Sequence, residues 1–257
     1  NYYVWEEQSK LTGARLSIVP RPEDDDWTNS VINHIDSDKS IKLISLENNH
    51  WTDGGLLDLT QISNHIKGKN IKLLVDGTQS VGALPTDIQK MNPDFLVVSG
   101  YKWLLGPYNL GFCYISPEFH ENGQPLEHWW ASKKNSVDVT SLTNYPQEFL
   151  NGARKFDFGH RGNFHLLPPM ISSLEQLLEW GIDNIYEYIS NLNLQIINSV
   201  SSLGITPIDD KHRAGHYLGL RFPREVPDDF TQYLNKNNVH VSVRGKYAVR
   251  VTPNVWV

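Results

Sequence analysis

Two short, continuous apolar runs constrain the fold of this 257-residue chain more than any other feature of its sequence. Residues 73–75 and 95–98 lack the polar alternation of a half-exposed strand, which favours parallel strands buried on both faces. Asp76 closes the first run, and Lys102 follows the second. Because ligands of open α/β sheets bind beyond the carboxyl ends of the strands, the pattern predicts that Asp76 and Lys102 share one site.

Strand-like and helical segments alternate along the first part of the chain. Three further segments have the composition of strands: residues 16–19, 41–46 and 110–115. The last follows Lys102 too closely for a helical crossover and is predicted as an antiparallel neighbour. Asp58 is the predicted N-cap of a helix that runs to about Lys67, where Gly68 ends it. This alternation predicts an α/β fold with a mostly parallel sheet flanked by helices.

The second part of the chain has a different pattern. Residues 123–161 have weak periodicity, which is more typical of a functional loop than of a spacer. A helical pattern begins at residue 168, and Gly181 separates it from a second helix that reaches about residue 200. The remainder combines strands with one helix. Strands are predicted at residues 205–208, 216–222, 239–243 and 248–252, and the helix at residues 227–236. We therefore predict a large α/β domain over residues 1–190 and a smaller C-terminal α+β domain over residues 191–257.

Charge and cysteine content exclude several classes of function. The net charge is −6 and no basic run exceeds Lys133-Lys134, which argues against a nucleic-acid partner. A single cysteine, Cys113, rules out an internal disulfide and a cysteine-clustered zinc site, and it fits a cytoplasmic location. No histidine spacing matches a metal signature, so no metal is expected. No apolar stretch approaches the roughly 20 residues of a membrane span, so no membrane association is expected.

A carboxylate and a lysine at neighbouring strand ends suit a pyridine-aldehyde cofactor, pyridoxal 5'-phosphate. Lys102 would form a Schiff base with the aldehyde and then transfer protons at the substrate Cα, and Asp76 would keep the ring nitrogen protonated. Gln79 lies one helical turn past Asp76, within reach of the ring 3-oxygen. Ser99 and Tyr101 place hydroxyl groups beside Lys102 that suit a phosphate. Each residue alone has an ordinary structural explanation; only their joint spacing supports the cofactor.

Three further residues are candidates for substrate binding. Arg250 lies in an apolar strand, where an unpaired guanidinium is costly, and its planar fork suits a carboxylate. The alternative is a strand arginine that faces solvent, and Arg244 competes for the same role. His50 and Trp51 follow the predicted strand at 41–46 and should reach the same edge of the sheet. For both, substrate contact and a packed turn remain open.

The sequence resembles the class V aminotransferases, a family of fold type I pyridoxal-phosphate enzymes that includes cysteine desulfurases, kynureninases and isopenicillin-N epimerase-like proteins. Four segments carry the resemblance: LLVDGTQSVGALP (73–85), VVSGYKWLLGP (97–107), GHRGN (159–163) and AVRVTPNVW (248–256). For the first two segments the resemblance implies the same cofactor roles as above. Lys102 forms the Schiff base, Asp76 pairs with the ring nitrogen and Gln79 contacts the 3-oxygen, while Ser99 and Tyr101 bind the phosphate. It implies that Arg250 binds the substrate α-carboxylate. It also implies that Gly162 and Asn163 reach the cofactor phosphate of a partner subunit in a homodimer.

The same resemblance implies an enzyme that acts on an amino acid, as an aminotransferase or as a lyase that needs no cysteine. Desulfurase activity is disfavoured because residues 241–251, VSVRGKYAVRV, contain no cysteine where desulfurases carry theirs. A non-catalytic member of the fold with a binding or regulatory role is the alternative. Family members also carry an N-terminal phosphate-binding loop and a closing C-terminal helix, so we expect both domains to lack part of their length in this sequence.

Overall fold

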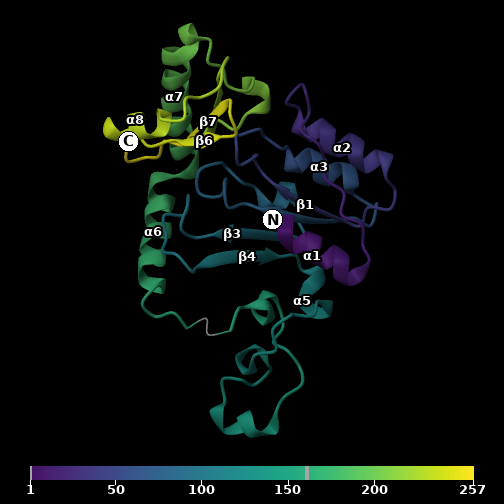
Figure 1. The fold of residues 1–257 in the computed structure, drawn as a ribbon. Coiled ribbons are helices and arrows are strands. Elements are labelled where there is room, and N and C mark those ends of the chain that lie inside the picture. Colours follow the sequence, from purple (N-terminus) through teal and green to yellow (C-terminus); the bar gives the residue numbers. More distant parts are fainter. Residues whose placement is uncertain (1, 160–161) are drawn as a thin grey trace.

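A computed structural model describes residues 2–159 and 162–257, without the side chains of residues 141–142. Its larger sheet has the order β1-β2-β3-β4, with strands β1 (Leu43–Glu47), β2 (Lys72–Asp76), β3 (Phe95–Ser99) and β4 (Gly111–Ile115) (Figure 1). The first three strands are parallel, and β4 runs antiparallel to β3. Both the mostly parallel sheet and its antiparallel neighbour are thus confirmed.

The apolar runs form the core of this sheet. Leu73, Val75, Leu96 and Val98 are buried, and each such side chain stabilises the fold by roughly 1.5–3 kcal/mol relative to an exposed position. Helices α3 (Leu59–Ile66), α4 (Ile88–Met91), α6 (Leu167–Trp180) and α7 (Ile182–Val200) add buried side chains to the same cluster. As predicted, Asp58 caps α3 by accepting a hydrogen bond from the Gln61 N–H group.

The segment before β1 differs from the prediction. Residues 16–19 form no strand, because no strand lies beside them to pair with, and Ile18 is 63% exposed. Two helices lie here instead, α1 (Tyr2–Thr12) and α2 (Trp27–Ser37). α2 buries Trp27, Val31 and Ile35, one side chain per turn, whereas α1 buries none and is attached through the Trp5 indole, which donates to Ser45 on β1 (3.0 Å).

Helices α6 and α7 form a column along one side of the molecule (Figure 1), and Gly181 with φ +79° separates them as predicted. A second, antiparallel sheet follows with the order β5-β7-β6, where β5 is Leu218–Arg221, β6 is Ser242–Arg244 and β7 is Ala248–Val251. The helices after α7 are η4 (Ser201–Leu203), η5 (Asp210–His212) and α8 (Phe230–Lys236). The strand expected at 205–208 is reduced to one bridge between Thr206 and Arg221. The predicted domain boundary at residue 190 falls inside α7 and stays a prediction.

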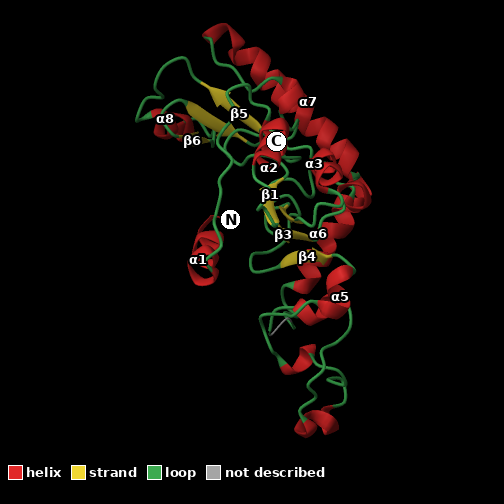
Figure 2. Cartoon of the chain, turned by 90° about the vertical axis from the view of Figure 1, so that its right-hand side faces the viewer, coloured by secondary structure: helices red, strands yellow, loops and turns green. Residues whose placement is uncertain are grey.

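Residues 123–159 project from the body as a separate lobe, which both views show below the sheet (Figures 1 and 2). The lobe follows α5 (Glu118–Asn122) and contains the short helices η1 (Trp130–Ser132), η2 (Val139–Asn144) and η3 (Ala153–Phe156). At its base the Glu127 carboxylate accepts the Gly159 N–H group (2.8 Å), and the buried Lys155 ammonium donates to the Glu121 carbonyl (3.1 Å). A functional role for this loop stays a prediction.

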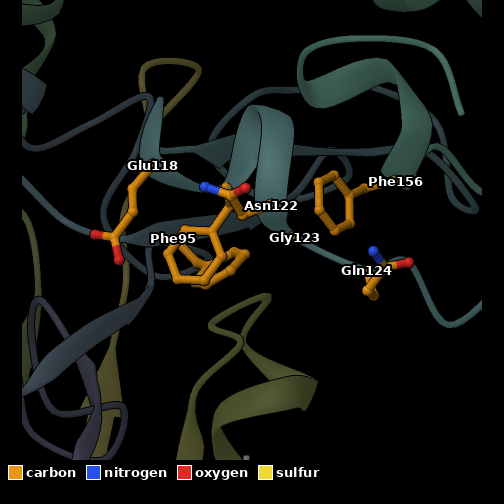
Figure 3. Close-up of a pocket in the computed structure, with 7 residues that line it drawn as sticks. Phe95, Glu118, Asn122, Gly123, Gln124 and Phe156 are labelled. Carbon is orange, nitrogen blue, oxygen red and sulfur yellow. The ribbon is translucent and has the colours of Figure 1, made fainter.

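A cavity of about 390 Å³ lies between α5 and η3, lined by three phenylalanines, Phe95, Phe119 and Phe156, and by polar groups of α5 and the residues after it (Figure 3). None of the predicted site residues lines it. Within the described part of the chain, no helix combines the length and the apolar character needed to cross a membrane. Cys113 lies on β4, an edge strand of the sheet, and its side chain is exposed.

Candidate active site

The carboxyl ends of β1, β2 and β3 bring the first group of site residues together. Asp76 ends β2 and lies in register with Glu47, which ends β1, and Ser99 ends β3. Thr78 joins two of these ends, because its N–H group donates to the Asp76 carboxylate (3.0 Å) and its hydroxyl oxygen accepts the Ser99 N–H group (3.1 Å). The Thr78 and Ser99 hydroxyls are 3.4 Å apart. A carboxylate and two hydroxyls therefore line one edge of the sheet.

Lys102 lies in a loop of fixed shape between β3 and β4. The Gly100 N–H group donates to the Leu110 carbonyl, and the Gly106 N–H group donates to the Gly100 carbonyl, both at 2.8 Å. A Cβ atom at Gly106 would lie 2.1 Å from the Met170 sulfur, so the Met170 side chain of α6 packs directly against the backbone of the loop. The loop thus holds Lys102 against the rigid body of the fold.

The pKa of Lys102 is lowered, and the causes of the shift identify its neighbours. Burial lowers this pKa first, the Asp76 carboxylate raises it, and the Arg250 guanidinium lowers it again. Lys102 therefore interacts with both predicted partners, Asp76 from the large sheet and Arg250 from the small one. Among the described residues, neither the Lys102 ammonium nor the Asp76 carboxylate has a salt-bridge partner within 4.0 Å. Tyr101 stacks on Tyr108 with ring centroids 4.3 Å apart and is 39% exposed.

The second sheet meets the large one at Trp51. The Arg250 guanidinium lies 3.4 Å from the Trp51 carbonyl oxygen and 3.2 Å from the Tyr217 hydroxyl, and that hydroxyl donates to the same carbonyl (2.5 Å). The Arg244 guanidinium lies 5.2 Å from the centre of the Trp51 ring. The Trp51 N–H group in turn donates to the Glu47 carboxylate (3.1 Å). One residue of the loop after β1 thus contacts side chains from both sheets.

Glu47 was not singled out by the sequence analysis. Burial raises its pKa to about 7, the Trp51 N–H group lowers it, and the Asp76 carboxylate raises it further. The same strand-end argument that found Asp76 applies to Glu47, so the signal was present in the sequence. Thr78 and Tyr217 were also missed. For Tyr217, which precedes β5 and is 1% exposed, no sequence signal exists, because its role depends on how the second sheet packs.

His50 adopts the packed alternative. Its ring stacks on Trp27 at 4.8 Å, and its Nδ1 atom lies 2.7 Å from the Thr52 hydroxyl and 3.3 Å from the Asp53 carboxylate. Burial lowers its pKa to about 4. Trp51, by contrast, is 46% exposed and reaches the site.

Gln79 follows Asp76 as expected, and its backbone carbonyl accepts a hydrogen bond from the fully buried His216 imidazole (2.8 Å). Gly162 and Asn163 lie just before α6, and a Cβ atom at Gly162 would meet nothing within 4 Å. No described contact joins either residue to the strand ends. His160 and Arg161 of the same motif lie outside the described residues.

A mostly parallel sheet with an aspartate at one strand end and a partly buried lysine in the loop after the next strand has the groups that a carbonyl cofactor requires. The chain belongs to the aminotransferase class V family, whose model matches residues 1–255.

Two curated relatives and one solved structure illustrate the similarity. A probable cysteine desulfurase of Pyrococcus abyssi is 30% identical over 94% of this chain and 58% of its own length. An uncharacterized aminotransferase of Schizosaccharomyces pombe is 28% identical over 80% of the chain and 52% of its own length. The Escherichia coli cysteine desulfurase CsdA superposes with a TM-score of 0.82 at 17% identity, covering 99% of this chain and 64% of that one. The chain spans about half the length of the curated relatives that it matches.

Members of this family are enzymes that depend on pyridoxal 5'-phosphate. The described residues fit that cofactor, because Lys102 offers an amine with a lowered pKa, and Asp76 offers a carboxylate that no cation neutralises. The hydroxyls of Thr78 and Ser99 are neutral donors of the kind that hold a phosphate.

Proposed function

We propose that this protein is a pyridoxal-phosphate-dependent enzyme that acts on an amino acid by moving the proton of its Cα atom. One observation carries the proposal: the partly buried Lys102 amine lies near enough to both Asp76 and Arg250 for their charges to shift its pKa, and Asp76 ends the strand next to β3, which the Lys102 loop follows. An amine, an acid and a carboxylate-binding fork are thus available within one site.

Each residue has a defined task in this proposal. When bound, the cofactor supplies an electron-withdrawing ring that stabilises negative charge at Cα. Asp76 would hold a proton on the ring nitrogen, and Gln79 would contact the 3-oxygen. Lys102 would accept the Cα proton and return it. Arg250 orients the substrate by binding its α-carboxylate.

Ser99 and Tyr101 complete the proposed cofactor site as phosphate-binding hydroxyls. The link between Thr78 and Ser99 supports this assignment, since it holds two hydroxyl groups 3.4 Å apart at the strand ends. Thr78 therefore joins the proposed phosphate-binding residues.

The reaction class that we favour is transamination or a lyase reaction that needs no cysteine. Residues 241–251 carry no cysteine, and the single thiol, Cys113, lies on β4 in register with Val97, away from the strand ends. Without a thiol near Arg250, the chain offers no acceptor for sulfur.

The test uses the full-length protein. Purified protein should absorb visible light, and borohydride reduction should attach the cofactor covalently to the Lys102 peptide in a mass spectrum. Lys102→Ala should lose this attachment while Lys69→Ala, at an exposed surface lysine, keeps it. A colourless protein without a cofactor adduct would contradict the proposal. A bound cofactor whose absorbance no amino acid changes would favour the alternative, a non-catalytic binding role.

We also propose a homodimer in which Gly162 and Asn163 contact the cofactor phosphate of the partner subunit. Open space around Gly162 supports this arrangement, as do exposed apolar side chains on and beside α6, namely Phe164, Leu167, Ile171 and Leu178. Light scattering of the full-length protein should give twice the mass of one chain, and a monomer that binds cofactor would contradict the arrangement. A cytoplasmic location is proposed from the single cysteine.

A further inference from the structure

We propose that the amino-acid substrate carries a second carboxylate, which Arg244 binds while Arg250 binds the α-carboxylate. This inference rests on the proposed function, because it takes the Lys102 site to be the place where an amino acid binds. It assigns a separate task to Arg244, which the sequence presented only as a competitor of Arg250.

The register of the small sheet directs both arginines to one face. Arg250 on β7 pairs with Ser242 on β6, and Arg244 lies two residues further along β6. Paired residues of an antiparallel sheet share a face, and so do residues two apart on one strand, so both side chains project the same way. Such diagonal neighbours have Cα atoms roughly 7–8 Å apart, a span that two long side chains can bridge around one small ligand.

Trp51 contacts both guanidinium groups. Arg250 lies 3.4 Å from its carbonyl oxygen, and Arg244 lies 5.2 Å from the centre of its ring. Trp51 is 46% exposed, so its indole offers an apolar surface beside Arg244. A short chain of methylene groups with a carboxylate at each end would match this arrangement of charge, apolar surface and charge.

Within the described part of the chain, no carboxylate neutralises the charges of the two arginines. Among the described residues, neither guanidinium has a carboxylate within 4.0 Å, whereas Arg221 binds both oxygens of Asp25 at 2.8 and 2.5 Å. The Nε atom of Arg244 is buried and has no hydrogen-bond partner in the described structure. Burial and the neighbouring Arg250 both lower the pKa of Arg244. Two close, unpaired cations are costly, and one α-carboxylate neutralises only one of them.

The test measures binding of two matched probes, glutarate and its monoamide glutaramate, to the full-length holoenzyme by isothermal titration calorimetry. The two probes differ in one charge, and neither has an amine, so neither reacts at Lys102. Glutarate should bind roughly tenfold more tightly or better, as expected for a hydrogen-bonded charge pair. Equal affinities for the two probes would overturn the proposal.

Three variants test whether Arg244 causes the preference for glutarate over glutaramate. Arg244→Gln should remove the difference between the probes and leave the affinity for glutaramate unchanged, whereas Arg250→Gln should weaken both. Arg224→Gln is the matched control, since it removes an exposed charge of the same region and should keep the preference. If Arg244→Gln weakens both probes equally, Arg244 has only a structural role and the proposal fails.

Failure of the second-carboxylate proposal can be distinguished from failure of the proposed enzyme function. Lys102→Ala should abolish covalent attachment of the cofactor and still discriminate glutarate from glutaramate. Discrimination without any cofactor adduct would refute the proposed enzyme and keep the paired-arginine site. An adduct without discrimination would refute only the second carboxylate. With amino acids as the readout, Arg244→Gln should raise KM for L-glutamate roughly tenfold and leave KM for L-glutamine unchanged.

Discussion

At the scale of single residues, the Glu47 carboxylate holds the backbone of the loop that carries Trp51. Its carboxylate accepts the Trp51 N–H group while the Trp51 carbonyl accepts hydrogen bonds from Arg250 and Tyr217. The peptide groups flanking Trp51 therefore connect the end of β1 to the second sheet. We therefore expect a displacement of Glu47 to change the position of Arg250, which we propose binds the substrate carboxylate.

The raised pKa of Glu47 predicts a dependence of stability on pH. The pKa of Glu47 is about 7 in the folded protein and 4.5 in the unfolded chain, so the folded state binds the proton more tightly. The stability of the fold therefore falls as the pH rises from 4.5 to 7 and the carboxyl ionises. Glu47→Gln removes this loss, and its stability relative to wild type should grow by about 2 kcal/mol from pH 4.5 to pH 8, with partial exposure discounted. Urea unfolding at several pH values measures the difference. Glu187→Gln, at an exposed position of α7, is the control, and parallel pH profiles for Glu47→Gln and wild type would contradict the prediction.

A second prediction concerns Tyr217, which contacts Arg250 and the Trp51 carbonyl through its hydroxyl. Tyr217→Phe leaves the guanidinium less firmly oriented, so KM for the amino acid should rise roughly five- to tenfold with little change in kcat. Steady-state kinetics with wild type and variant checks this split. Tyr188→Phe, whose hydroxyl donates to the terminal Val257 carbonyl, should behave as wild type. A fall in kcat at constant KM would show that Tyr217 acts on the chemical step instead.

At the scale of elements, one glycine controls how the site loops pack. Gly82 follows β2 with φ +104°, and a Cβ atom there would lie 2.5 Å from the Trp103 carbonyl oxygen, next to Lys102. The segment that carries Asp76 and Gln79 can approach the lysine loop only because this position has no side chain.

This contact predicts unequal costs for two matched substitutions. Gly82→Ala combines a left-handed backbone with a backbone clash and should destabilise the protein by roughly 3 kcal/mol or more. Gly68→Ala, with φ +79° and open space around it, should cost about 1 kcal/mol. Thermal unfolding of both variants measures the difference. Equal costs would mean that the loops can separate without loss.

The elements also show what sequence patterns can and cannot predict. The buried apolar runs correctly predicted β2 and β3. Asp58 and Gly68 predicted the limits of α3, and Gly181 predicted the break between α6 and α7. The strand expected at 16–19 failed because strand composition does not supply a pairing neighbour. Asp76 and Lys102 were predictable from strand ends. Tyr217 was not, because its position depends on contacts between segments far apart in the sequence.

At the scale of the whole molecule, His216 connects the two sheets. It precedes β5, is fully buried, and donates to the Gln79 carbonyl in the loop after β2, with the Trp103 ring 5.2 Å away. Burial lowers its pKa to about 4, so the ring is neutral at physiological pH. The loop after β2 and the second sheet are thus joined by a group that becomes charged only in acid.

The buried imidazole predicts a loss of stability in acid. The unfolded histidine binds its proton near pH 6.5 and the folded one near pH 4, so stability is full above pH 6.5 and falls as the pH drops to 4. This group contributes about 3 kcal/mol to that fall. His216→Gln should be less stable at neutral pH but should show a shallower decline between pH 6.5 and 4. Because His50 titrates in the same range, the difference between variant and wild type isolates His216, and identical slopes would contradict the prediction.

The lobe at residues 123–159 has a consequence for how this protein can be altered. Its two stems are fastened together where Glu127 meets Gly159 and Lys155 meets Glu121, and the segment beyond them extends away from the sheet (Figure 2). Phe156 and the buried Lys155 of this lobe pack against α5, so only the part between the stems, residues 128–154, is expected to be exchangeable. Replacing that part with a short glycine linker should leave the sheet and its helices folded.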